Sequence, residues 1–243
     1  MLDPLALGDQ VRADHRSEFQ AALNAGTLDL RGRPGRHYVH IPPRPRLTST
    51  LIMPDGCSII GDGVDVTTIV FYCDPMGVDW AGIRVGNDWR ITGVSLEVEE
   101  PGGDWDEQSH VLEVVGPVTK GEMSYCSIDH PLVPGSSRGD CIRFRGYSPS
   151  QTIWDQVCHH VDFRRSARSG VSIHSGLYGE LLADGHSSTR FHHCKFTNIA
   201  DQDLDCEGSG DIVGIECDHN EHLAGGNPQT SLSVSLASPL FSP

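Results

Sequence analysis

The run DQDLDCEGSGD, residues 201–211, concentrates acidic side chains at five positions: Asp201, Asp203, Asp205, Glu207 and Asp211. Like charges at this spacing repel one another unless neighbouring groups compensate them. Two carboxylates at a separation of about 5 to 10 Å can also serve as the catalytic pair of a glycoside hydrolase. The run is therefore a candidate metal site, a candidate catalytic pair or a solvated turn, and the elements that position it decide between these readings.

The overall composition restricts the classes of function. The chain of 243 residues has 33 Asp and Glu against 18 Lys and Arg, a formal charge of −15. A nucleic-acid partner is disfavoured, because phosphate binding needs a basic surface. No apolar run reaches membrane-spanning length, and the first ten residues lack the layout of a signal peptide. We expect cytoplasmic synthesis without a signal peptide, no membrane insertion and no nucleic-acid partner.

Short stretches of alternating apolar residues recur through the chain. Their first apolar residues lie at intervals of 29, 30, 29, 33 and 28 positions: Ile83, Leu112, Ile142, Val171, Leu204 and Leu232. Alternation with period two indicates strands, and the absence of helical patterns between them excludes βαβ units. Strands that recur in this way fit a coil that advances by about 4.8 Å per repeat. The sequence predicts an all-β fold, a single-stranded parallel β-helix (solenoid).

The eight cysteines occur within apolar alternations and form no CxxC pair. Cys126, Cys194 and Cys217 are predicted to share one inward column with Val94 and Val161 in a second sheet. We interpret the cysteines as buried free thiols that pack as small hydrophobic side chains.

The N-terminal segment has a different pattern. Residues 17–26, SEFQAALNAG, predict a short amphipathic helix with Phe19 and Leu23 on one face and Gly26 at its end. A helix there would cover the open edge of the solenoid. We predict an N-terminal arm and helical cap over 1–35, the parallel β-helix over 36–236 and a C-terminal tail over 237–243.

Three stretches, EFQAALNAG, YVHIPP and TSTLIMPDGCSIIGDGVDVTTIVF, resemble the opening of the pectate-lyase-like right-handed parallel β-helix superfamily. That opening has a short helix, an IPPG-x-Y strand and a G-x-G-x-x-x-T-x-I segment. GDGVDVTTI matches closely, whereas IPPRPR lacks the usual glycine. The resemblance implies a right-handed β-helix that is pectin lyase-like and acts on or binds polysaccharides, as lyases, hydrolases, epimerases and phage tail spikes of the superfamily do. Spike members often trimerise, so it also implies a homotrimer.

The predicted stacking gathers a polar patch on the outward face of the middle coils: Arg143, Arg145, His174, Asp203, Asp205 and Glu207. Successive residues on one face of a strand lie about 7 Å apart at Cα, so Asp203, Asp205 and Glu207 are candidate catalytic carboxylates of a hydrolase. The acidic run thus lies beside cationic groups that compensate its charge.

A lyase would use the patch differently, with His174 or Arg145 as the base and Ca²⁺ held by Asp as the group that neutralises a uronate. Arg143 and Arg145 also suit substrate binding without chemistry, because guanidinium groups recognise acidic glycans. Trp105, in the acidic loop 97–110, is a candidate for stacking on a sugar ring.

A second polar constellation involves histidines. His160 and His193 are predicted to stack outward on successive coils, with Glu216 as a third neighbour. Two histidines and a carboxylate can bind a transition metal. Stacked histidines beside Asp162 and Lys195 are, however, typical of a polar surface, so no metal and no other cofactor is predicted.

No catalytic motif of the superfamily is intact, since the polygalacturonase-like pattern NTD…DD…GHG…RIK is absent. Catalysis, non-catalytic glycan binding and a solvated face all stay open for the patch. The preferred hypothesis is a virion-associated, phage spike-like or fibre-like protein at the virion or cell surface. It would bind a surface polysaccharide, with depolymerisation by a hydrolase or lyase reaction as its enzymatic form, and would contact other virion proteins. A non-catalytic structural virion protein, such as a fibre, capsid decoration or adhesin, is the alternative.

Overall fold

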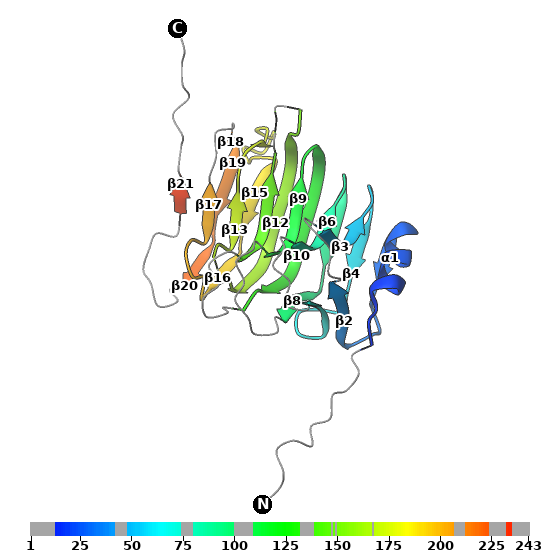
Figure 1. The fold of residues 1–243 in the computed structure, drawn as a ribbon. Helices are drawn as coiled ribbons and strands as arrows, with labels where there is room; N and C mark the ends of the chain where they lie inside the picture. The colour runs from blue at the N-terminus through cyan, green and yellow to red at the C-terminus, as the bar shows by residue number, and fades with distance from the viewer. Residues whose placement is uncertain are drawn as a thin grey trace, which may run out of the picture.

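The fold is built almost entirely of strands that stack side by side from one end of the molecule to the other (Figure 1). The computed structural model describes residues 13–41, 48–73, 80–99, 109–131, 139–146, 148, 150–166, 168–206, 212–223 and 232–234. Within these ranges there is one helix, α1 (Arg16–Asn24), and it lies at the N-terminal end of the stack. No helix in the same ranges has the length and apolar character needed to cross a membrane.

Two sheets contain all the named strands. The smaller, sheet B, has seven strands in the described ranges and receives one strand from each passage of the chain. In chain order these are β3 (Thr48–Met53), β6 (Trp80–Val85), β9 (Ser109–Val115), β11 (Gly139–Arg145), β13 (Val171–Ile173), β17 (Leu204–Cys206) and β21 (Leu232–Val234).

The larger sheet, sheet A, has fourteen strands in the described ranges and wraps around the remaining sides of the coil. Its first members are β1 (Thr27–Asp29), β2 (Gly35–Ile41), β4 (Ser58–Ile60), β5 (Thr67–Cys73), β7 (Trp89–Thr92), β8 (Ser95–Glu99) and β10 (Val118–Asp129). The others are β12 (Ile153–Arg165), β14 (Leu177–Tyr178), β15 (Thr189–His192), β16 (Lys195–Thr197), β18 (Ile212–Val213), β19 (Ile215–Asp218) and β20 (Glu221–Leu223).

The register of sheet B follows the spacing of the apolar repeats. Leu112 pairs with Ile83 on one side and with Ile142 on the other. The column continues through Val171 to Leu204 and Leu232. All the pairings between named strands are parallel, so each coil stacks on the equivalent part of the next. The predicted all-β parallel β-helix is confirmed.

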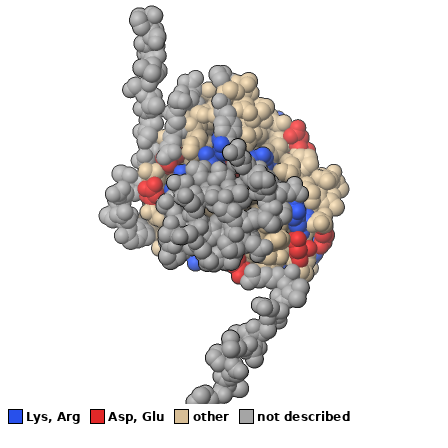
Figure 2. Space-filling view, viewed as in Figure 1, with Lys and Arg blue, Asp and Glu red and all other residues tan. Residues whose placement is uncertain are grey.

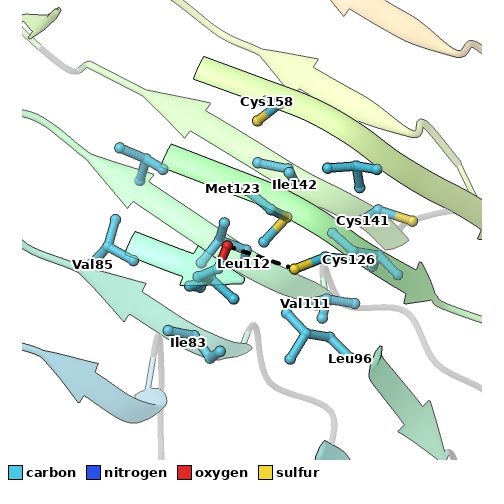
Figure 3. Packing of buried hydrophobic residues seen from close by; sticks show 14 of the residues in the cluster. Ile83, Val85, Leu96, Val111, Leu112, Met123, Cys126, Cys141, Ile142 and Cys158 are labelled. Carbon is cyan, nitrogen blue, oxygen red and sulfur yellow. Dashed lines mark hydrogen bonds between the residues drawn. The ribbon is translucent and has the colours of Figure 1, made fainter. Parts of the chain in front are cut away.

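The core fills the space between the two sheets. Leu112 and Ile142 of sheet B and Met123 and Cys126 of sheet A are fully buried and point into the same interior (Figure 3). The thiol of Cys126 also donates to the carbonyl of Ile91 at 3.6 Å. Six free cysteines in the described part are buried, as expected for thiols used as core side chains.

Cys217 is an exception, and its predicted place in the column of Cys126 and Cys194 is wrong. It is exposed and pairs with Phe191 instead. The offset between neighbouring coils is 33 residues from Cys158 to Phe191 but only 26 from Phe191 to Cys217. The side chain of Asn220 lies at Cys194, where its Oδ1 accepts a hydrogen bond from the Cys194 N–H.

Helix α1 caps the N-terminal end of the stack, as predicted. Phe19 and Leu23 are fully buried beneath it. The Gln20 side-chain amide donates to the carbonyl of Ile52 at 2.8 Å and accepts from its N–H at 2.9 Å. One amide side chain thus satisfies both backbone groups of an edge residue in β3, where a further strand would otherwise pair.

The stacked core gives a first test. Leu112→Ala removes a fully buried side chain between two coils and should lower the free energy of unfolding by about 2–5 kcal/mol. Leu181→Ala makes the same chemical change where the side chain is 81% exposed, and should alter stability by less than about 0.5 kcal/mol. Urea unfolding measures both; equal effects of the two substitutions would contradict the assignment of Leu112 to the core.

Candidate functional site

The outward face of sheet B carries a row of polar side chains across successive coils. Its members are register partners in order along the stack: Arg84, Glu113, Arg143, Ser172 and Asp205. Arg143 and Asp205, which the sequence predicts on the outward face, are both members of this row. Because neighbouring coils are about 4.8 Å apart, opposite charges on adjacent rungs lie within contact distance.

Glu113 connects two arginines. Its carboxylate accepts two hydrogen bonds from Arg84, at 2.6 Å from Nη2 and 3.2 Å from Nε. Nη1 of Arg145 lies 3.5 Å from its other oxygen. Glu113 is 1% exposed, whereas Arg84 is 34% exposed. Burial alone would raise the pKa of Glu113, but the Arg84 guanidinium outweighs it and the pKa falls below its usual range, so the carboxylate is ionised.

A second row lies beside the first and centres on His110 and Asp140, which are register partners on β9 and β11. Both side chains are buried, and His110 Nδ1 lies 3.1 Å from Asp140 Oδ2. Arg168 binds the same carboxylate with Nε, at 2.7 Å, and with Nη2. Burial acts to raise the pKa of Asp140, but His110 and Arg168 together hold it well below the ordinary value.

The contacts of His110 define its tautomer. Nη1 of Arg143 lies 2.8 Å from His110 Nε2. A guanidinium can only donate, so Nε2 accepts, and the neutral ring carries its proton on Nδ1, facing Asp140. Asp140, His110 and Arg143 therefore form a relay in which the lone pair of His110 is already engaged. In this arrangement His110 positions Arg143 and does not act as a general base.

The predicted site residues are placed as follows. Arg143 and Arg145 lie in this network, through His110 and Glu113 respectively. His174 is half-buried beside β11, and its backbone N–H donates to the backbone carbonyl of Phe144 at 3.0 Å. Glu207 and Trp105 lie outside the described residues.

Asp203 and Asp205 contact different parts of the structure. Asp205 is buried in the outward row of β17. The Gln202 side-chain amide lies against its carboxylate, and with the amide turned so that its nitrogen faces Asp205 it donates to both oxygens, at 2.9 and 3.2 Å. Asp203 instead accepts a hydrogen bond of 2.7 Å from Nδ1 of His222, on β20 of sheet A. The two carboxylates therefore have separate partners.

Sequence reasoning did not select His110, Asp140 or Glu113 as site residues, although a signal was present. His110 and Asp140 are 30 positions apart, the same interval as Leu112 and Ile142 in the adjoining core column. Two complementary side chains at the repeat interval are stacked on neighbouring rungs and must interact. The oppositely charged pair Arg84 and Glu113 follows the same rule.

The predicted histidine stack is confirmed in part. The rings of His160 and His193 lie parallel with centroids 5.1 Å apart. The prediction of Glu216 as their third neighbour is wrong, because Glu216 pairs with Arg190 in the register and accepts a hydrogen bond from His186 Nδ1 at 2.8 Å. The next ring in the stack is that of His219. Across the described residues, no three His, Cys, Asp or Glu side chains form a ready metal cage.

On the face of the molecule shown in Figure 2, basic and acidic side chains of the described residues are interspersed. They do not separate into large areas of one sign, which agrees with the paired Arg and carboxylate groups found on sheet B.

Comparisons with known proteins give little further information. No protein-family model matches the chain, and no curated protein matches it. Among solved structures, the A-module of mannuronan C-5 epimerase AlgE4 from Azotobacter vinelandii is 13% identical over 91% of this chain and 96% of that one, with a TM-score of 0.23. The AlgE6 A-module from the same organism is 12% identical over 88% and 96%, with a TM-score of 0.24. These TM-scores carry no argument, and the fold assignment rests on the strand pairing itself.

A buried histidine beside the site predicts an acid-sensitive fold. His130 is fully buried, and its Nε2 is 2.8 Å from the Ser109 hydroxyl. Burial lowers the pKa of His130 to about 4. An unfolded histidine titrates near pH 6.5, so the unfolded state takes up a proton first as the pH falls. The free energy of unfolding should therefore decrease from about pH 6.5 to about pH 4, by up to about 1.4 kcal/mol per pH unit.

Urea unfolding at a series of pH values measures this slope. His130→Gln, which keeps a hydrogen-bonding group near Ser109 but does not titrate, should flatten the dependence in that window. His186→Gln changes a half-exposed histidine and should leave the pH dependence of stability unchanged. A wild-type stability that is constant between pH 6.5 and pH 4 would rule out the effect.

Proposed function

We propose that the protein binds an acidic polysaccharide along the outward face of sheet B. The observation that carries the proposal is the Arg84–Glu113–Arg145 group, in which one buried carboxylate orients two guanidiniums. Guanidinium groups recognise carboxylates and sulfates through paired N–H donors. A side chain that is already held in place loses less conformational entropy when a ligand binds, which favours affinity.

The arrangement suits a polymer more than a small anion. Arg84 and Arg145 lie on β6 and β11, the two strands that flank β9. Their backbones are thus two rungs apart, about 10 Å along the axis of the solenoid. A glycan chain that runs along this axis crosses the strands and can contact both arginines through successive acidic sugars. Arg84 is the more exposed of the two and is the expected first contact.

Binding without chemistry is the favoured form of this function. The carboxylates of Glu113 and Asp140 are buried and ionised by their arginine partners, so neither is available as a proton donor. The lone pair on His110 Nε2 is occupied by Arg143.

Depolymerisation is the second candidate. The Asp140–His110–Arg143 relay favours cleavage by elimination over cleavage by hydrolysis with a pair of carboxylates. If a uronate carboxylate displaced His110 as the partner of Arg143, Nε2 of His110 would become a base with Asp140 behind it. Such a base could remove the proton from the carbon next to the neutralised carboxylate; the electron pair of that C–H bond forms a C=C bond, the bond to the glycosidic oxygen breaks, and water or the protonated His110 returns a proton to the leaving oxygen, which gives an unsaturated uronate. The ultraviolet absorbance of that product distinguishes cleavage from binding.

A binding experiment tests the proposal. Affinity electrophoresis or calorimetry with polygalacturonate and polymannuronate should show binding that weakens at high salt, and neutral dextran should not bind. Arg84→Gln should weaken binding roughly tenfold, as expected for the loss of a charge-assisted hydrogen bond. Arg145→Gln should act in the same direction. The matched control is Arg31→Gln, which removes an exposed arginine that pairs with Asp29 near the N-terminal cap.

Two results would overturn the assignment of this face. One is equal affinity of wild type, Arg84→Gln and Arg145→Gln for every acidic polymer that binds. The other is loss of binding in Arg31→Gln to the same extent as in Arg84→Gln, which would indicate a general charge effect.

The biological setting that we propose is the one the sequence favours, a spike-like or fibre-like component of a virion surface that assembles as a homotrimer. Its support is the sequence resemblance together with an acidic chain whose described cysteines are free. Light scattering on the purified protein should give three times the chain mass of 26.4 kDa. A mass of one or two chains at micromolar concentration would refute the trimer and leave the glycan-binding proposal unaffected.

A further inference from the structure

A ladder of aromatic rings follows one corner of the solenoid, away from the arginines of sheet B. The rings of Tyr125, His160, His193 and His219 are stacked with centroids 4.8, 5.1 and 5.0 Å apart along the ladder. Their φ angles are 52°, 54°, 53° and 50°, so each coil makes the same left-handed turn at this position. We call these four residues the corner ladder.

The corner ladder faces solvent. Tyr125 is 57% exposed, His219 is 70% exposed, and His160 and His193 also belong to the exposed residues. Three stacked imidazoles at an exposed corner have their ring edges accessible to a ligand. Stacking alone would be served equally well by tyrosine, which occupies the first position of the ladder.

Nδ1 of each ladder histidine contacts the side chain of the preceding residue. Nδ1 of His160 lies 3.0 Å from Nδ1 of His159, and Nδ1 of His193 lies 2.9 Å from Nδ1 of His192. In the last coil, Nδ1 of His219 lies 2.7 Å from Asp218 Oδ2. The same contact is thus made on three successive coils.

These contacts determine which nitrogen faces solvent as an acceptor. The Asp218 carboxylate can only accept, so His219 donates from Nδ1, and the neutral ring has its lone pair on Nε2. His159 Nε2 lies 3.3 Å from the Glu122 carboxylate, which can only accept, so in the tautomer that donates from Nε2 the Nδ1 of His159 accepts from His160. His160 therefore also has its lone pair on Nε2. No hydrogen bond from another described residue reaches Nε2 of His160, His193 or His219.

We propose that the corner ladder binds a divalent transition-metal ion through Nε2 of His193 and Nε2 of His160 or His219, with water at the remaining positions. Neutral imidazole is a preferred ligand for Zn²⁺, Ni²⁺ and Cu²⁺. Metal-binding histidines commonly donate their other N–H to a carboxylate or similar group, which orients the ring and makes it more basic. Nδ1 of His219 has a carboxylate as its partner, and Nδ1 of His160 and of His193 has Nδ1 of the preceding histidine.

The distances define the kind of site. A metal–nitrogen bond of about 2.0–2.1 Å lets one ion join two nitrogens that are no more than about 4 Å apart. The ladder rings are parallel to within 5°, with centroids 5.0 and 5.1 Å apart. A bound ion lies in the plane of each imidazole that holds it, so two neighbouring rings must tilt until their planes converge on the ion and their Nε2 atoms come within about 4 Å. Exposed side chains on adjacent coils permit this tilt. The site is therefore a two-nitrogen site completed by water, which agrees with the lack of a three-residue cage among the described residues.

The position of His193 gives the proposal a specific signature. His193 belongs to both adjacent pairs, whereas His160 and His219 belong to one pair each. Loss of His193 removes both sites, and loss of either end leaves one. The ladder can therefore hold one ion per chain with two alternative arrangements.

The test uses the full chain without an affinity tag, titrated calorimetrically with ZnCl₂ and NiCl₂. Wild type should bind one ion. His193→Asn should weaken binding at least about tenfold, as is usual when the groups that hold a metal are removed. His160→Asn or His219→Asn should weaken it only about twofold, the statistical loss of one of two arrangements. Asparagine is chosen because it tolerates the left-handed conformation at these positions.

Tyr125→Asn is the matched control, since it removes a stacked ring with the same backbone conformation but no ligand nitrogen. It should leave metal affinity unchanged, and circular dichroism should confirm that all four variants are folded. Three results would overturn the proposal: no binding by wild type, wild-type affinity in folded His193→Asn, or an equal loss in Tyr125→Asn and His193→Asn. The last result would assign the effect to ring stacking. None of these outcomes depends on glycan binding by sheet B.

Discussion

Each strand in the described part of the two sheets hydrogen-bonds in parallel to the strand one coil away, and every other feature of the molecule follows from that pairing. Parallel pairing places a residue directly beside its counterpart in the next coil, about 4.8 Å away. An inward apolar residue must therefore be followed by another apolar residue at the repeat interval, as Ile83, Leu112 and Ile142 show. A narrow core of this kind uses cysteine alongside aliphatic side chains because each column has little space.

The same stacking determines the chemistry of the outward face. A buried carboxylate is costly unless a partner compensates its charge, and the partner must come from an adjacent rung. Glu113 has Arg84 on one side and Arg145 on the other, and Asp140 has His110 and Arg168. Because removal of any one of these partners leaves a buried carboxylate with less compensation of its charge, the groups of the network depend on one another. That property makes its arginines well-positioned ligands for an anionic polymer.

The corner ladder arises from the backbone at a turn. The chain changes direction between parts of sheet A at a residue with positive φ in each coil, beginning with Gly93. Glycine adopts this conformation without strain, and histidine is among the other residues that are enriched in it. Once three coils place histidine there, parallel stacking brings the rings to a separation of about one rung. A requirement of the backbone thus produces a row of imidazoles with a repeated hydrogen-bonding pattern.

The sequence by itself determined those features that depend on the burial of apolar side chains. The apolar spacing predicted the register of sheet B from Ile83 to Leu232, because an inward column tolerates few polar residues and leaves a regular signal. The amphipathic pattern predicted α1 with its buried Phe19 and Leu23. The same spacing placed Arg143 and Asp205 together on the outward face.

The tertiary structure decided which polar groups meet. Cys217 lies in a local pattern like that of Cys194, and a place in the same column would need an offset of 23 residues. Only the pairing of β15 with β19 reveals the offset of 26 residues that puts Cys217 beside Phe191 instead. Changes in repeat length occur in the loops between strands, so the alternation of apolar residues within a strand does not reveal them. The contact of Asp203 with His222 and the relay from Asp140 to Arg143 likewise depend on side chains from other coils. Periodicity fixes the face on which a residue lies, but the partner of a charge depends on three-dimensional packing.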